Sequence, residues 1–363
     1  MKDRIKNIIK TIVFIIVICF IAVHLTYILR RVSYSRDNVG GISREGDLDI
    51  VCIGGSSTAV YWKPLYAWKE YGMLSYDYAT SAYRMPVTIG AVKDVLAKKD
   101  PKLLVLDMRP FTYGDEGLED AEQGIRNMAD SMDFGVNRLL TVKDALEFYG
   151  ADIFDKENLS FFVDLIKYHT NTEALGKEKS WEHVNNNAAT DNKGFQFSDE
   201  AYNIILPDPG EIEAEKRQAL EPEKEAYLRR LLDYLKTQDV DVLFVVSPAP
   251  MSELKQEKNN YIGDIVDSYG YKFLNTNLCY EEMGIDFAKD FYDTGHVNVY
   301  GADKYTKLVG EYIRENYDIP DRSLDDKYAS EWNEAYEAFL EKDIETKALV
   351  DEEYNSNVKA AAE

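Results

Sequence analysis

Five short apolar runs, separated by stretches with helical periodicity, constrain the fold of this chain more than any other feature. The third, 102–108, is almost continuously apolar, as a strand buried on both faces is, and the others occupy 48–55, 74–79, 240–247 and 271–275. Helical spacing recurs between them, at 56–72, 86–100, 222–238, 251–268 and 301–317. Strands that alternate with helices predict a parallel sheet. We therefore expect an α/β domain over 48–318, with a three-layer, doubly wound, five-stranded parallel sheet of the flavodoxin-like kind.

The chain between the third and fourth runs lacks this alternation. Helices are expected near 119–131, 141–149 and 158–168, followed by a polar stretch at 185–194. We interpret about 112–221 as a mainly helical insertion, which either caps a site or only adds packing. The chain after 318 is acidic and rich in Ala, Glu and Lys, which predicts a solvated helical tail at 319–363.

The N-terminus carries a stretch of nineteen residues without Asp, Glu, Lys or Arg, TIVFIIVICFIAVHLTYIL at 11–29. A helix needs about 20 apolar residues to span a bilayer. A cleaved signal peptide has a shorter apolar region and a small-x-small cleavage site, so we favour an uncleaved transmembrane anchor. Bases flank both ends, and the four within 1–10 favour a cytoplasmic stub with an extracytoplasmic body. Residues 30–47 are expected to be a juxtamembrane linker.

Charge is distributed unevenly along the 363 residues. The net charge is −23, but residues 1–36 sum to +6 and the remainder to −29. So acidic a body excludes nucleic acid as a partner, because nucleic-acid binding needs Lys and Arg to neutralise phosphates. Arg126 and Arg138 are read either as solvated surface residues or as contacts for an anionic polymer. The three cysteines form no C-x-x-C pair, and buried, inert thiols are expected, with a Cys52–Cys279 pairing left open.

Two short motifs can carry chemistry. Gly54-Gly55-Ser56-Ser57-Thr58 follows the first run, where a strand-to-helix turn would expose a serine hydroxyl at the carboxyl edge of the sheet. The glycines alone fit a phosphate cradle or a tight turn equally well, although the P-loop and dinucleotide motifs do not match. The second motif, Asp293-Thr294-Gly295-His296, follows the fifth run, and it offers a base and a carboxylate to orient that base. Both motifs fall at the same predicted sheet edge.

Together the two motifs resemble the SGNH/GDSL hydrolase family, which has a G-D-S-like block after its first strand and D-x-x-H before its last helix. The resemblance covers roughly 48–110 and 240–317. It implies that Ser56 is the nucleophile, with Ser57 as the alternative, that His296 is the general base and that Asp293 orients it. The family's oxyanion Gly and Asn have no counterparts in Ala79-Thr80-Ser81-Ala82 and Asp107-Met108-Arg109-Pro110. We expect the oxyanion or substrate contacts to come instead from Gly55, Ser57, Thr80, Arg109 and Asn298, with an ion pair to Asp107 as the alternative for Arg109.

Within that family, the chain most resembles membrane-anchored DltD-like surface proteins, which also have a single N-terminal anchor. The resemblance implies a serine acyl-ester hydrolase or O-acyltransferase that acts on an acylated cell-surface polysaccharide beside a multipass membrane O-acyltransferase. It implies no cofactor and no metal. The missing oxyanion residues leave open a non-catalytic SGNH-fold protein that binds or scaffolds the same partners. A metal-dependent phosphoesterase is disfavoured, because histidines and carboxylates do not cluster at ligand spacing.

Overall fold

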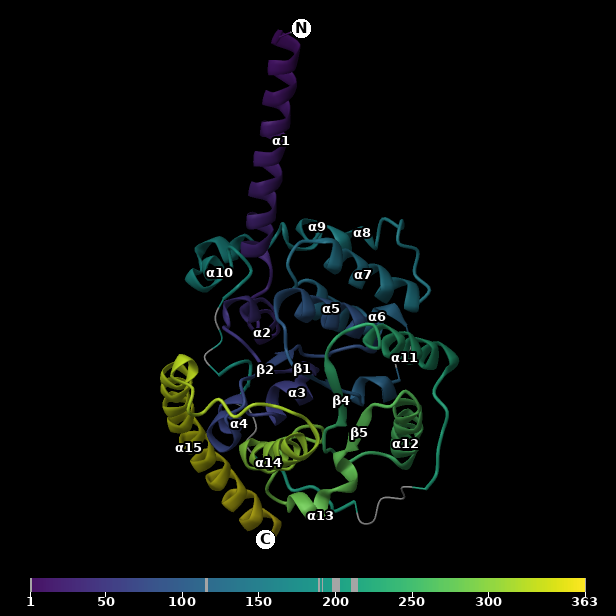
Figure 1. Cartoon of the computed structure of the whole chain (residues 1–363), viewed down its shortest axis with the longest axis vertical. Coiled ribbons are helices and arrows are strands. Elements are labelled where there is room, and N and C mark those ends of the chain that lie inside the picture. The colour runs from purple at the N-terminus through teal and green to yellow at the C-terminus, as the bar shows by residue number, and fades with distance from the viewer. Residues whose placement is uncertain are drawn as a thin grey trace.

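The computed structural model describes residues 2–114, 117–188, 190, 192–197, 203–209 and 215–362. A five-stranded sheet lies at its centre, with helices around it and the long helix α1 (Lys2–Leu29) projecting from one end (Figure 1). The strands are β1 (Ile50–Gly54), β2 (Ser75–Ala79), β3 (Leu103–Asp107), β4 (Asp241–Val246) and β5 (Lys272–Asn275). Their order is β2-β1-β3-β4-β5 and every pairing is parallel. The predicted five-stranded parallel sheet is confirmed.

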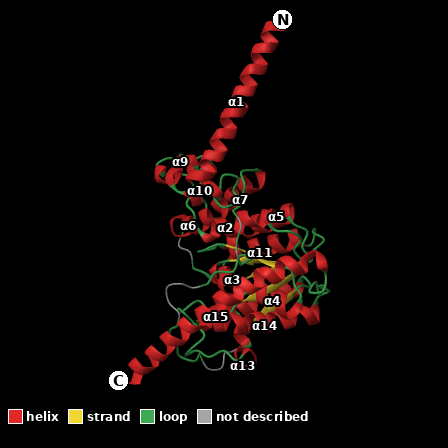
Figure 2. Ribbon diagram, turned by 90° about the vertical axis from the view of Figure 1, so that its left-hand side faces the viewer, coloured by secondary structure: helices red, strands yellow, loops and turns green. Residues whose placement is uncertain are grey.

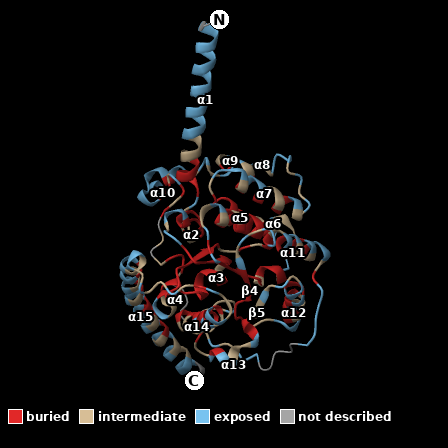
Figure 3. Cartoon of the chain, in the orientation of Figure 1, coloured by how far each residue is buried: buried red, intermediate tan, exposed pale blue. Residues whose placement is uncertain are grey.

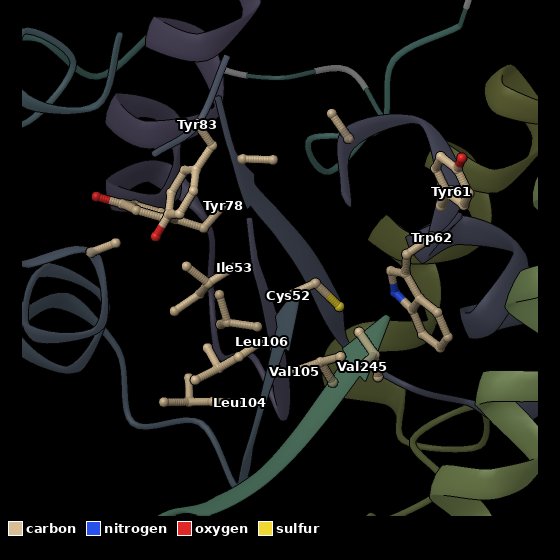
Figure 4. Close-up of a cluster of buried hydrophobic side chains, with 14 of the residues drawn as sticks. Cys52, Ile53, Tyr61, Trp62, Tyr78, Tyr83, Leu104, Val105, Leu106 and Val245 are labelled. Atoms are coloured by element: carbon tan, nitrogen blue, oxygen red, sulfur yellow. The ribbon is translucent and has the colours of Figure 1, made fainter. Parts of the chain in front are cut away.

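Alternate residues of the central strands point to opposite faces of the sheet, and both sets are buried. In Figure 4, Ile53, Leu104 and Leu106 lie on one side with Tyr78 and Tyr83. Cys52, Val105 and Val245 lie on the other side, where α3 (Ser56–Tyr61) contributes Tyr61 and the next residue is Trp62. No face of β1 or β3 meets water, which is why these strands read as continuous apolar runs.

Helices follow the strands much as the periodicity predicts. The first predicted helix is divided into α3 and α4 (Pro64–Tyr71), because Pro64 disfavours helical geometry at Lys63. The other four are α5 (Thr88–Lys98), α11 (Pro222–Leu235), α12 (Glu253–Ser268) and α14 (Val299–Asn316). The chain between β3 and α11 holds α6 (Leu118–Ala129), α7 (Val136–Phe148), α8 (Leu159–Phe162), α9 (Leu165–Tyr168) and α10 (Glu178–Glu182). Short 3-10 turns join several of these elements, η1 (Ile42–Arg44), η2 (Met85–Val87), η3 (Arg109–Thr112), η4 (Thr172–Gly176) and η5 (Thr276–Leu278), and α13 (Tyr280–Met283) precedes the loop before α14.

The expected juxtamembrane linker is instead part of the folded body. Residues 34–41 form α2 (Tyr34–Gly41), and Val39 and Ile42 are completely buried. Arg30 is also buried and ion-paired with Asp164. Polar and glycine-rich sequence suggested a linker, but tertiary burial of these residues overrides that local preference. The chain therefore passes from α1 into the body without a free connecting segment.

The acidic C-terminal tail is helical, but it is not solvated along its length. Helix α15 (Asp326–Ala362) runs beside α4, as Figures 1 and 2 show. Its residues Trp332, Phe339 and Val350 are buried. Charged residues dominate its composition, and the few apolar ones that form its contact face give little sequence signal. The tail is therefore packed against the body as part of the folded domain.

A buried ion pair holds α15 to the body. The Lys63 ammonium is wholly buried, 2.5 Å from Asp343 of α15 and 2.6 Å from Asp303 of α14. Lys347 also pairs with both carboxylates, at 2.6 Å and 2.7 Å. We expect Lys63→Met to lower the free energy of unfolding by about 3 kcal/mol, because the two carboxylates then share one ammonium group where they had two. Guanidinium denaturation of the full-length protein in detergent measures this. Lys327→Met, which removes an exposed ammonium from the same helix, should change stability far less; equal effects would contradict the role given to Lys63.

Candidate active site

The first motif forms a tight strand-to-helix turn. Strand β1 ends at Gly54, Gly55 precedes α3 in an extended conformation, and α3 begins at Ser56. A Cβ at Gly54 would lie 2.1 Å from the Thr58 hydroxyl and 2.8 Å from the Asp107 Cβ, so no larger residue fits there. This close approach of helix to strand places Ser56 at the carboxyl edge of a central strand, where α/β proteins bind their ligands.

The second motif forms a closed loop just before α14. Phe291 and Val297 make an antiparallel bridge across the loop, and the Tyr292 amide donates to the His296 carbonyl at 3.1 Å. The Gly295 amide donates to Asp293 Oδ1 at 2.7 Å. The Tyr292 ring stacks on the His296 ring, with centroids 5.4 Å apart. These contacts fix the imidazole before any ligand is present.

Ser56, His296 and Asp293 lie in hydrogen-bonded series. Ser56 Oγ is 2.7 Å from His296 Nε2. His296 Nδ1 is 2.9 Å from each carboxylate oxygen of Asp293. This is the order that a nucleophilic serine requires: a hydroxyl, a base within reach of its proton, and a carboxylate that fixes the tautomer of the base. Residues 240 positions apart in the chain are thus brought together as the sequence predicts.

Electrostatics at the loop favour an ionised Asp293. Partial burial raises the pKa of this carboxyl group, but hydrogen bonds from His296 and from the Gly295 amide outweigh that effect, and the net pKa lies below the usual value. The group therefore stays a carboxylate near neutral pH. A carboxylate on the Nδ1 side favours the imidazole tautomer whose Nε2 is free to accept the Ser56 proton.

Ser57, the alternative nucleophile, has a different environment. Its side chain is buried, and its hydroxyl donates to Asp107 Oδ2 at the end of β3. Burial raises the pKa of the Asp107 carboxyl group, and hydrogen bonds from Ser57 and the Arg109 amide oppose that rise. Ser57 therefore braces the turn against β3, whereas Ser56 is the serine that contacts His296.

Two donors expected to bind an oxyanion, the Thr80 amide and the Asn298 side-chain amide, are already hydrogen-bonded, whereas the buried Thr80 hydroxyl has no partner among the described residues. The Thr80 amide donates to the Gly54 carbonyl at 3.2 Å, continuing the β1–β2 ladder. The Asn298 side chain caps α14, accepting from the Tyr300 amide at 3.0 Å, while its Nδ2 donates to the Lys289 carbonyl at 2.6 Å. These two amides therefore serve the sheet and the helix cap. A Cβ added at Gly55 would lie 3.3 Å from the Tyr83 Cβ and 4.0 Å from the Thr80 carbonyl oxygen. The Ser56 amide is at the first position of α3, where an N–H has no partner within its own helix.

Arg109 holds the histidine loop. Its guanidinium donates to the Gly295 carbonyl at 2.9 Å and to the Tyr61 hydroxyl at 3.3 Å. Burial lowers the pKa of the guanidinium, but Tyr61, Tyr113 and Asp107 raise it by more. The net pKa lies above the usual value, so the group remains a cation. Asp107, the alternative partner considered for Arg109, is contacted by the main chain: the Arg109 amide donates to Asp107 Oδ1 at 3.1 Å. Arg109 is therefore a positioning residue whose charge lies next to the loop between Asp293 and His296.

Sequence reasoning missed Tyr61, Tyr292 and the Ser57–Asp107 contact. The Tyr61 hydroxyl, five residues after Ser56, lies 2.9 Å from the Gly295 carbonyl and joins the two motifs. Tyrosine is abundant in this chain, with 26 residues, so no local signal marks these two. Asp107, the acid at the end of β3, was visible in the sequence. Its contact with Ser57 depends on the register between β1 and β3, which the sequence does not show.

A cavity of about 580 Å³ lies between the base of α1 and helices α2, α6 and α9. Tyr34 and Ser81 line it on the side nearest the carboxyl edge of the sheet. Burial chiefly raises the pKa of Tyr292, and the nearby Tyr34 adds a smaller rise. Arg126 also lines it and is ion-paired with Glu122 at 2.6 Å. Arg138 is completely buried behind it, bound to Asp164. Neither arginine is the free surface base that the sequence suggested.

No protein-family model matches this chain, and neither does any curated protein. Among the described residues, no group of three or more His, Cys, Asp or Glu side chains could hold a metal ion, and Cys19, Cys52 and Cys279 are free thiols. The chemistry assigned to the site therefore depends on its geometry.

Proposed function

We propose that this protein is a serine acyl-ester hydrolase or O-acyltransferase of the SGNH type. One observation carries the proposal: Ser56 Oγ, His296 Nε2 and the Asp293 carboxylate form a continuous hydrogen-bonded series at the carboxyl edge of a parallel sheet. The strand order and the positions of the two motifs, after β1 and before α14, support the SGNH assignment. In this reading the helices between β3 and α11 are an insertion into that fold.

The residues act in a defined order in the proposed reaction. His296 Nε2 removes the proton from Ser56 as Oγ attacks the acyl carbonyl, and Asp293 stabilises the imidazolium. Negative charge on the carbonyl oxygen is stabilised by the Ser56 amide at the start of α3 and by the field of Arg109. His296 then protonates the leaving alcohol. Water or a polymer hydroxyl attacks the acyl-enzyme in the second half, with His296 as base.

The substrate class is proposed from the resemblance to membrane-anchored SGNH proteins, and the position of the site agrees with it. Helix α1 is long and apolar enough to cross a membrane, and α2 begins five residues after α1 ends. Ser35 of α2 accepts a hydrogen bond from the Ser81 amide just beyond β2, so the catalytic edge lies close to the base of the anchor. We propose an extracytoplasmic body that works on an acylated cell-surface polysaccharide, with a multipass membrane O-acyltransferase as its partner.

A second function is favoured by the occupied main-chain amide of Thr80 and the occupied side-chain amide of Asn298. If the Ser56 amide alone cannot stabilise an oxyanion, the protein is a non-catalytic SGNH-fold scaffold that binds the same glycan or acyltransferase. Removing one oxyanion donor costs an enzyme about 10²–10³ in kcat. The scaffold would therefore bind its partners without measurable turnover of aryl acetates.

Covalent labelling separates the two functions. The full-length protein in detergent is treated with a fluorophosphonate probe, and the modified peptide is identified by mass spectrometry. The enzyme should carry one adduct, on Ser56, because that hydroxyl alone of the two serines has an imidazole within 2.7 Å. Absence of any adduct, with aryl acetate hydrolysis at the uncatalysed rate, would favour the scaffold.

A further inference from the structure

Helix α1 is exposed over most of its length, but its last two turns are inserted into the body. Residues 3–21 are exposed, whereas Thr26–Arg30 are buried (Figure 3). The Tyr27 hydroxyl accepts a hydrogen bond from the Phe134 amide at 2.7 Å, and His24 Nδ1 is 2.7 Å from the Val184 carbonyl. The base of the anchor is thus a rigid part of the domain.

This insertion leaves the anchor short of a bilayer. The free apolar stretch between Lys10 and the body is 11–21, which at 1.5 Å per residue is about 16 Å long. The hydrocarbon core of a bilayer is about 30 Å thick. If the body stayed outside the membrane, Lys10 would lie near the bilayer midplane, where an ammonium group is strongly disfavoured.

Exposed apolar side chains surround the point where α1 enters the body. Seventeen large apolar side chains of the described body and α15 are exposed, and ten of them fall within 134–181: Phe134, Val136, Leu139, Leu140, Phe154, Leu159, Val163, Ile166, Leu175 and Trp181. We call these ten residues the collar. The other seven are dispersed, at Ile205, Leu254, Leu278, Leu324, Ile344, Leu349 and Val358.

The elements that carry the collar all lie at the α1 end of the molecule. Helices α9 and α10 and turn η4 contact α1 directly. Helix α7 packs on α5 by one face, so its exposed face is turned away from the sheet, toward the end from which α1 projects (Figure 1). The collar therefore surrounds the anchor on the side where a membrane would lie.

We propose that the collar is seated in the lipid bilayer, so that the body is a monotopic domain as well as an anchored one. Amphipathic elements bury their apolar side about 5–10 Å into the boundary between head groups and acyl chains. That depth lengthens the effective span from about 16 Å to about 21–26 Å, and snorkelling of Lys10 supplies the remainder. The inference depends on α1 spanning the membrane and is independent of the acyl chemistry.

The chemistry of the collar fits lipid rather than an acidic or basic partner. Trp181 is half exposed, and its indole N–H is bonded to the Leu175 carbonyl at 2.9 Å, so an apolar ring is what it presents outward. Tryptophan favours the membrane–water interface. Exposed lysines and glutamates alternate around it, as in Lys177, Glu178 and Lys179. Seating should therefore depend little on salt or on anionic lipid.

Trp181 supplies a built-in depth probe. The other three of the four tryptophans, Trp62, Trp68 and Trp332, are buried in the body. The full chain is placed in nanodiscs, one copy per disc, with or without lipid brominated in the acyl chain near the head group. We expect bromolipid to quench wild-type emission and to leave Trp181→Phe unaffected, at low and high salt alike.

A pair of matched cysteines provides an independent measurement. In a Cys279→Ser background, Ile166→Cys on α9 and Leu254→Cys on α12 replace side chains of nearly equal exposure, 49% and 53%. An aqueous maleimide should modify residue 166 about tenfold more slowly than residue 254 in nanodiscs, because the collar lies among the head groups. Equal rates, together with no bromolipid quenching, would overturn the proposal and would make the collar a surface for a protein partner or a second copy.

Discussion

Replacing Ser56 with alanine is expected to reduce kcat for aryl acetate hydrolysis by about 10⁶-fold, which is the loss seen when a triad nucleophile is removed. The physical reason is the contact of Ser56 Oγ with His296 Nε2 at 2.7 Å, since within the described chain no other serine hydroxyl has an imidazole partner. Labelling by the fluorophosphonate probe should disappear at the same time. Because Ser56 is partly exposed at the start of α3, the variant should fold normally.

Ser57→Ala is the matched control, one residue along the same turn. It removes the hydroxyl that donates to the buried Asp107 carboxyl group, which is expected to cost about 1–3 kcal/mol of stability because a buried acceptor loses its partner. Labelling of Ser56 should persist in this variant. If instead Ser57→Ala abolished labelling and Ser56→Ala did not, the nucleophile would have been assigned one residue too early.

The sheet was predictable because its strands are buried on both faces. A strand such as Leu103–Asp107 must be apolar at nearly every position, which gives a signal that survives without an alignment. The two motifs could then be placed, because carboxyl ends of parallel strands share one edge. The triad follows from that topology and from the chemical pairing of serine, histidine and carboxylate.

The oxyanion residues were not predictable in the same way. Backbone donors depend on which amides the sheet and the helix caps already use, and this is decided in three dimensions. The Thr80 amide is taken by the β1–β2 ladder and the Asn298 side chain by the cap of α14. Arg109 was marked as a cation near the site, but its partner, the Gly295 carbonyl, comes from a loop 186 residues away.

The two ends of the chain show a similar limit. Hydropathy marks 11–29 as one apolar stretch, but it does not distinguish residues that project from the body from residues that enter it, such as Tyr27. The composition of 319–363 predicts a solvated helix, whereas Trp332 and Phe339 fix it to the body. In both segments a few tertiary contacts outweigh the average character of the sequence.

Asp293→Asn is expected to lower kcat by about 10⁴-fold, or about 5 kcal/mol of transition-state stabilisation, while leaving the fold intact. The Asn amide can donate to His296 Nδ1, which forces the proton onto Nε2, and that nitrogen then cannot accept the proton of Ser56. The Gly295 amide still finds an acceptor in the Asn carbonyl, so the loop keeps its shape. Steady-state hydrolysis of an aryl acetate and the rate of probe labelling measure the loss.

The double variant Ser56→Ala/Asp293→Asn tests whether these residues work as one unit. Asp293 acts on the reaction only through His296, and His296 acts on Ser56, so removing the carboxylate after the nucleophile has gone should cost almost nothing further. The double variant should therefore be as inactive as Ser56→Ala alone. Losses that multiply independently, or an Asp293→Asn variant with wild-type kcat, would mean that another group orients His296 during catalysis and that the Asp293–His296 contact at 2.9 Å is only structural.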